Sequence, residues 1–401
     1  MRKFPRMLTA IGALGAAALT LAGCAGAGTP VADDGTFRVV TTTTQLDDFT
    51  KQVVGDTGAE VTSLLQPGTS VHGYEPTPAD LEALRKADVV IFNGVGLEPW
   101  LDATLTSAEF TGTRIDASVG FDPDSMHDDH GHAAPEATDG AATEDAHEGH
   151  DHGAEESHEG HDHEGHDHEG HDHGTEEAPA ASEDPAETDA HDDHAHDDHG
   201  HSHDGHDHGG INPHIWTSPD VAQLMVNNVA AGLGEADAAN AATYTANASS
   251  YNDKLQALDD WTAENIKTIP AEKRLLVTNH DALTYFNDEY HVTFVGSIMP
   301  SWDDNAEPSA AQIDELIANI KSSGVTAIFT EQQLAPETAN AIASETGAKV
   351  YSGEEGLYTD ALGAAGSSGA TYISSQVHNV TQLMDSWGAT VTPLPSELAG
   401  A

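Results

Sequence analysis

The sequence predicts an α/β protein of two Rossmann-like lobes with parallel sheets, joined by one long linking helix, with a ligand site in the cleft between the lobes. Segments typical of strands and helices alternate over residues 37–116, and a second such series covers residues 274–387. This alternation is typical of parallel sheets with helices on both faces. Between the two series, residues 236–267 contain no Gly or Pro. A helix of that length reaches about 45 Å at 1.5 Å per residue, enough to connect two lobes.

The elements of the first lobe follow from the spacing of apolar residues. Pro78 and Asp80 favour the start of a helix, and residues 88–92 have the few polar positions of a buried parallel strand. The pattern stops at Met126 and resumes at Ile211. We expect strands over 37–41, 61–65, 88–92 and 113–116, and helices over 46–54, 78–86, 97–106 and 221–233.

The second lobe repeats the pattern after the linking helix, which Pro270 closes. We expect strands over 274–278, 292–295, 325–330 and 349–351, and helices over 282–289, 309–321, 336–346 and 372–387. The predicted organisation is a signal segment (1–23), a tether (24–36), an N-terminal lobe (37–235) with an insert (126–209), the linking helix (236–270), a C-terminal lobe (271–392) and a tail (393–401).

The first residues are typical of a signal peptide for export. Arg2, Lys3 and Arg6 precede a short apolar stretch that ends in the sequence Leu-Ala-Gly-Cys at Cys24. This ending resembles a bacterial lipobox, and Cys24 is the only cysteine of the chain. We therefore expect a lipoprotein, lipidated at Cys24 and anchored to the outer face of the cell membrane. An ordinary secretory signal with an incidental cysteine is the alternative.

The charge of the chain favours cations as partners. Its 68 acidic and 14 basic residues give a formal net charge of −54. Such a surface repels nucleic acids and anionic membranes, so we expect no nucleic-acid partner. With one cysteine, the chain can form neither an internal disulfide nor a zinc site built on cysteines.

Most of the histidines lie in the insert. Residues 127–208 contain 21 of the 26 histidines and 28 acidic residues, but no Lys or Arg. The sequence Glu-Gly-His-Asp-His occurs four times, and the composition lacks the aliphatic residues of a packed core. We predict a disordered loop that binds zinc with low affinity, the alternative being a solvated spacer. Its ligands would include His147, His150, His152, His158, His161, His163, His166, His168, His171 and His173.

Four residues outside the insert are candidate metal ligands. His72 and His214 lie in loops of the first lobe, and His280 directly follows a strand of the second lobe. Asp360 follows the last strand of that lobe. Ligands of such sheets bind beyond the carboxyl ends of the strands. Three imidazoles and one carboxylate form a set that suits tetrahedral zinc better than manganese, which prefers oxygen.

Three further residues are of types that can bind metal. Glu331 follows a strand, and it is either a weaker rival to Asp360 or an outer partner of the ligands. His291 and His378 lack a comparable loop context, so we interpret them as ordinary surface or core residues.

The segments "HGYEPTPAD", "NPHIWTSP", "NHDALTYF" and "YTDALG" resemble, in this order and spacing, the zinc/manganese solute-binding proteins of bacterial ABC transporters, the cluster A-I family. The resemblance covers the mature chain except the insert. It implies an extracytoplasmic metal receptor with two α/β lobes, whose ligands fall on His72, His214, His280 and Asp360. Zinc-type members often carry a His-rich loop before the second ligand, and manganese-type members commonly have Glu where this chain has His280. Some zinc members have a disulfide in the second lobe, which this chain cannot form.

The sequence thus predicts a monomeric receptor that delivers Zn²⁺ to an ABC-type permease, with Mn²⁺ the less favoured cargo. A manganese or iron receptor of the same family is one alternative, and a surface adhesin or zinc store without a transporter is another. We do not expect an enzyme, because four protein ligands would close the site to water and no HExxH helix is present.

Overall fold

The computed structural model describes residues 35–123, 211–301, 307–332 and 336–400. All of them belong to one structural unit. The predicted signal segment, the lipidation site Cys24 and the His-rich insert lie outside the described residues.

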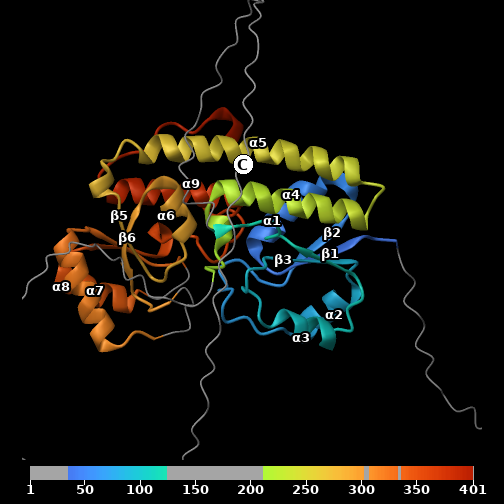
Figure 1. Cartoon of the computed structure of the whole chain (residues 1–401), viewed down its shortest axis with the longest axis horizontal. Coiled ribbons are helices and arrows are strands. Elements are labelled where there is room, and N and C mark those ends of the chain that lie inside the picture. Colours follow the sequence, from blue (N-terminus) through green and yellow to red (C-terminus); the bar gives the residue numbers. More distant parts are fainter. Residues whose placement is uncertain (1–34, 124–210, 302–306, 333–335, 401) are drawn as a thin grey trace, which may run out of the picture. The chain divides into compact units, whose positions relative to one another are not determined.

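The N-terminal lobe is built on a sheet of four parallel strands, in the order β2-β1-β3-β4 (Figure 1). The strands are β1 (Arg38–Thr41), β2 (Glu60–Ser63), β3 (Val89–Phe92) and β4 (Thr113–Asp116). Val39, Val90 and Ile91 are almost completely buried, as the apolar run of a central parallel strand requires. The strand order reverses between β1 and β3, and ligands of such sheets bind beyond the carboxyl ends of the strands at this point.

The helices of this lobe begin at polar caps. The Thr43 hydroxyl accepts a hydrogen bond from the Leu46 amide at the start of α1, and Thr77 and Asp80 cap α2 reciprocally. The helices are α1 (Thr44–Val54), α2 (Pro78–Lys86), α3 (Leu101–Ser107) and α4 (Pro219–Ala236). Helix α3 begins four residues later than expected, because the preceding chain turns at Gly94 and Gly96, both with φ above 80°.

The expected helix over 236–267 begins later than the sequence suggests. Helix α4 continues to Ala236, and α5 spans Ala241–Ile266. The break lies at Asp237, whose Oδ2 accepts hydrogen bonds from the side-chain Nδ2 of Asn240 at 2.6 Å and the Tyr244 hydroxyl at 2.8 Å. Such local bonds compete with a continuous helix.

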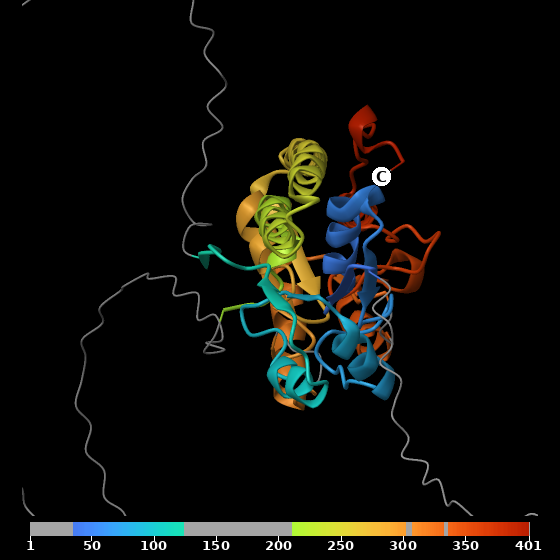
Figure 2. The same ribbon diagram turned by 90° about the vertical axis from the view of Figure 1, so that its right-hand side faces the viewer.

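Helix α5 connects the two lobes. It packs against α1 and α4 of the N-terminal lobe and against α9 of the C-terminal lobe (Figure 1). Figure 2 looks along α4 and α5 and shows them side by side. Tyr244, Tyr251, Leu255 and Leu258 form part of its buried face, at the spacing of an amphipathic helix.

The C-terminal lobe contains two pairs of parallel strands, β5–β6 and β7–β8, with β5 also in contact with β7. Most of its elements lie within two residues of the expected ranges, although β7 is confined to three residues. The strands are β5 (Leu275–Thr278), β6 (Thr293–Ser297), β7 (Ala327–Phe329) and β8 (Lys349–Tyr351). The helices are α6 (Thr284–Tyr290), α7 (Ala310–Ser323), α8 (Glu337–Thr346) and α9 (Tyr372–Ser386).

Within the described ranges, every helix is too short or too polar to span a membrane.

Candidate metal centre

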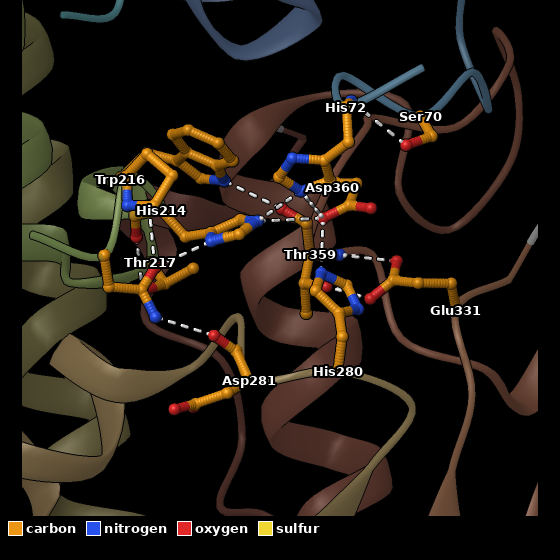
Figure 3. A network of polar contacts seen from close by, with 12 residues as sticks. Ser70, His72, His214, Trp216, Thr217, His280, Asp281, Glu331, Thr359 and Asp360 are labelled. Atoms are coloured by element: carbon orange, nitrogen blue, oxygen red, sulfur yellow. Dashed lines mark hydrogen bonds and ion pairs between the residues drawn. The ribbon is translucent and has the colours of Figure 1, made fainter. Parts of the chain in front are cut away.

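The four candidate ligands come from loops of both lobes. His72 lies in the loop between β2 and α2, and His214 immediately precedes a 3₁₀ turn (Ile215–Thr217) that leads into α4. His280 lies two residues after β5, and Asp360 lies in the loop between β8 and α9. Figure 3 shows the four side chains directed toward one another. The structure brings one ligand atom of each residue within 4.8 Å of the others.

The distances fit a single metal ion. Asp360 Oδ1 lies 2.9 Å from His280 Nε2, 3.2 Å from His214 Nε2 and 3.9 Å from His72 Nε2. The Nε2 atoms of His72 and His214 are 3.0 Å apart. Ligand atoms about 2.0–2.1 Å from a tetrahedral ion are separated by ~3.4 Å, so these spacings match such an ion.

Burial keeps the ligands in the protonation states that bind metal. His214 and Asp360 are fully buried and His280 nearly so, while the side chain of His72 is 3 % exposed. Burial lowers the pKa of His214 to about 4, so its imidazole is neutral at physiological pH. Burial alone would raise the pKa of Asp360, but the nearby His280 and His214 outweigh it and hold that pKa well below its usual value. Metals bind neutral imidazole and ionised carboxylate.

Among the described residues, several buried side-chain atoms lack a hydrogen-bond partner, and one of them belongs to this site. Asp360 Oδ2 is inaccessible to water and accepts no hydrogen bond. A buried carboxylate oxygen without a partner is costly. A cation held by Oδ1 and the three imidazoles would neutralise the charge of this buried carboxylate, so the donor set fits a bound metal.

Asn212 fixes the orientation of His214. The Asn212 side chain donates from Nδ2 to the Asp281 carbonyl at 2.7 Å and to the Thr284 hydroxyl at 2.8 Å, which leaves Oδ1 as an acceptor. Oδ1 lies 2.7 Å from His214 Nδ1. Nδ1 must therefore carry the proton, and Nε2 presents its lone pair to the centre. Since Asp281 and Thr284 belong to the C-terminal lobe, this contact also joins the lobes.

Donors of the N-terminal lobe bind the backbone around Asp360. Gln45 Nε2 donates to the Asp360 carbonyl at 3.2 Å. The Trp216 indole donates to the Thr359 carbonyl at 2.8 Å (Figure 3). The Tyr372 hydroxyl in turn donates to the Trp216 carbonyl at 2.7 Å. These bonds fix the Asp360 loop from the opposite lobe.

Glu331 lies outside the group of four. Its carboxylate accepts hydrogen bonds from the amide (3.1 Å) and the hydroxyl of Thr359 (Figure 3). Burial, and then the charge of Asp360, raise the pKa of Glu331 to about 8. Of the two sequence interpretations, the geometry matches the outer partner: Glu331 contacts the residue before the ligand.

The remaining histidines also lie outside this group. His378 is buried on α9, where its Nε2 contacts the Gly356 carbonyl at 2.8 Å. His291 ends α6 in the left-handed conformation, with φ of 51°. Asn212, Gln45 and Trp216 were not singled out from the sequence. Asn212 and Trp216 flank His214 within a quoted segment, but nothing in the sequence indicates the contact of Gln45 with a loop more than 300 residues away.

Comparison with known proteins agrees with this architecture. Residues 39–386 match the family model described as "Zinc-uptake complex component A periplasmic". The chain therefore belongs to this family, the solute-binding proteins of bacterial metal ABC transporters.

Relatives in the family are named for different metals. The chain is 27 % identical to the iron-binding protein YfeA of Yersinia pestis over 84 % of this chain and 82 % of that protein. It is 26 % identical to the manganese-binding lipoprotein MntA of Halalkalibacterium halodurans, over 90 % and 93 % of the two chains. The solved structure of the periplasmic zinc-binding protein TroA from Treponema pallidum shares the fold, with a TM-score of 0.62 and 19 % identity over 88 % and 99 % of the chains.

Proposed function

We propose that this protein is an extracytoplasmic receptor that captures Zn²⁺ between its lobes and delivers it to an ABC-type metal permease. The observation that carries the proposal is the buried group of His72, His214, His280 and Asp360, whose ligand atoms lie within 4.8 Å of one another. Three imidazole nitrogens with one carboxylate favour zinc over manganese, and His280 stands where a second carboxylate would favour manganese. Four protein ligands would close the site around a bound ion, which favours a receptor over an enzyme.

The identity of the bound metal is tested by competition between metal ions. Purified protein, first stripped of metal, is offered equimolar Zn²⁺, Mn²⁺ and Fe²⁺ without oxygen, and the bound metal is measured after gel filtration. Because divalent metals follow an intrinsic order of affinity, metal content is also measured in protein from cells limited for zinc or for manganese. Zinc in all preparations supports the proposal. Manganese or iron in protein from cells with ample zinc would favour a receptor for that metal.

The His-rich insert has a separate role in this proposal: it collects zinc at low affinity near the cleft. Imidazole binds metal only when it is neutral, so capture by the insert should weaken below about pH 6. Deleting residues 126–209 should leave one tight zinc site in calorimetry and remove the weaker ones, because all four ligands of the cleft lie outside the deletion. Loss of the tight site would contradict the assignment of the cleft.

The cellular role of the insert is tested by uptake. If it collects zinc, the deletion slows zinc uptake only in chelated medium. If it senses excess zinc, the deletion raises uptake in zinc-replete medium. Equal uptake in both media would indicate a solvated spacer.

Membrane attachment is proposed to depend on a lipid at Cys24, with the protein acting as a monomer. The Cys24→Ala variant should move from the membrane to the soluble fraction, since stable attachment requires acyl chains at about 0.8 kcal/mol per buried CH₂. Fractionation with a membrane-protein control measures this. A variant that stays with the membrane would refute the lipid anchor.

A further inference from the structure

Residues 93–100 form a loop beside the candidate metal centre and contain none of the four candidate ligands. The loop follows β3 at the carboxyl end of the N-terminal sheet, where β1 and β3 are neighbours. Gly94 and Gly96 adopt φ of 82° and 84°, and a side chain at Gly94 would collide with Asp116 and Ser118. The backbone is therefore confined to one tight path.

The Glu98 carboxylate organises this turn. It accepts hydrogen bonds from the Asn93 amide at 2.8 Å and the Gly94 amide at 3.3 Å. The Thr42 hydroxyl, directly after β1, donates to the same carboxylate at 2.6 Å. One side chain thus ties the loop to both central strands of the sheet.

The loop contacts the chain beside His214 through Asn93. Asn93 Nδ2 donates to the Pro213 carbonyl at 3.0 Å. The amide of the same peptide, on His214, donates to Asn212 Oδ1 at 3.1 Å. The carbonyl and the amide of the Pro213–His214 peptide are therefore both held by hydrogen bonds, and the bond to the carbonyl comes from this loop.

The other end of the loop contacts the chain beside His72. The rings of Trp100 and Tyr74 pack with their centroids 4.6 Å apart. Tyr74 lies two residues after His72, in a segment without regular secondary structure. The aromatic contact therefore supplies this irregular segment with a fixed neighbour.

We propose that residues 93–100 act as a brace that positions both metal-binding histidines of the N-terminal lobe, His214 through Asn93 and His72 through Trp100. The proposal rests on the proposed function, because it needs a tight metal site. The brace makes the placement of two ligands depend on one loop that touches no ion itself. Outer partners of metal ligands typically change affinity by about 10–100-fold when removed.

The test measures the zinc affinity of the full chain by competition with a chelator that registers only the tight site. We expect Asn93→Ala and Trp100→Leu each to weaken binding about tenfold or more. Asn228→Ala is the matched control, because its amide donates to two backbone carbonyls of the same lobe, those of Ala117 and Val119, at 2.8 Å. It should leave zinc affinity unchanged.

Double-mutant cycles separate positioning from a general loss of stability. In a His214→Ala background, Asn93→Ala should change zinc affinity by less than about twofold, whereas in a His72→Ala background it keeps its full effect. Trp100→Leu should show the reverse pattern. Equal effects in all backgrounds, or a loss in Asn228→Ala as large as in Asn93→Ala, would overturn the brace. Absence of a tight site in the unaltered protein would instead overturn the proposed function.

Discussion

The two lobes each supply two ligands but position them by different means. In the C-terminal lobe, His280 follows β5 almost directly, and the Thr278 hydroxyl at the end of this strand donates to the His280 carbonyl at 2.6 Å. His280 and Asp360 also contact each other at 2.9 Å. In the N-terminal lobe, His72 and His214 both lie in loops and approach each other at 3.0 Å. His280 is thus placed largely by its own sheet, whereas Asp360 and the two N-terminal histidines lie in loops that depend on neighbouring elements.

His214 shows the difference most clearly. Its imidazole is oriented by Asn212, which is itself bound to Asp281 and Thr284 of the opposite lobe. The geometry of an N-terminal ligand therefore depends on residues of the C-terminal lobe. In turn, Gln45 and Trp216 of the N-terminal lobe bind the backbone that carries Asp360. Metal binding and lobe contact are coupled through these reciprocal bonds.

The largest expected effect comes from removing a ligand. His280→Ala should weaken zinc binding by more than about a hundredfold, beyond the range of outer partners, because it leaves a closed, buried gap beside Asp360. His72→Ala should weaken it less: the His72 side chain is itself buried, but Gly73 and Glu75 of the same loop are exposed, so water can enter the gap that the imidazole leaves. Competition titration measures both.

His291→Ala is the control for these substitutions, because His291 ends α6 outside the four-ligand group. It should leave zinc affinity unchanged. If His72→Ala lowered zinc affinity as much as His280→Ala, the difference between the lobes would not affect how much each histidine contributes to zinc binding.

A smaller effect is expected from the residue that joins the lobes. Asn212→Ala removes the acceptor that holds the proton on His214 Nδ1, and it also removes the bonds to Asp281 and Thr284. We expect zinc affinity to fall by about 10–100-fold. Asn252→Ala is the matched control. It removes an exposed hydrogen bond from the side chain of Asn252 on α5 to the side chain of Asn227 on α4. Unchanged affinity in Asn212→Ala would show that His214 is oriented without the opposite lobe.

The four candidate ligands could be predicted from the sequence because they lie after strands or in loops, where ligands of parallel sheets bind, and the structure brings their ligand atoms within 4.8 Å of one another. His280 follows its strand almost directly, whereas Asp360 lies farther along the loop after β8. The outer partners could not be found in this way. Gln45 contacts Asp360 across more than 300 residues, and Asn212 needs the folded C-terminal lobe as its partner. The late start of α3 could not be predicted because the Glu98 carboxylate accepts hydrogen bonds from the backbone amides of Asn93 and Gly94, and helical periodicity does not reveal those bonds.

The smallest expected effect is a change in the free energy of unfolding with pH that is caused by Glu98. Burial raises the pKa of Glu98 to about 7, although hydrogen bonds from Thr42, Asn93 and Gly94 oppose the shift. The folded state therefore binds the proton more tightly than the unfolded chain, whose carboxyl has a pKa near 4.5. The contribution of Glu98 to the free energy of unfolding is complete below about pH 4.5 and is lost as the pH rises through about 7.

Glu98→Gln cannot titrate, so the stability of the metal-free protein relative to this variant should fall between pH 5 and pH 8. After a discount for partial exposure, the change should be on the order of 1–2 kcal/mol, measured by urea unfolding at each pH. Glu82→Gln, at an exposed carboxylate of α2, should show no comparable trend over this range. Parallel stability curves for Glu98→Gln and the unaltered protein would mean that solvent reaches this carboxylate and that the N-terminal loop is held less tightly than its contacts indicate.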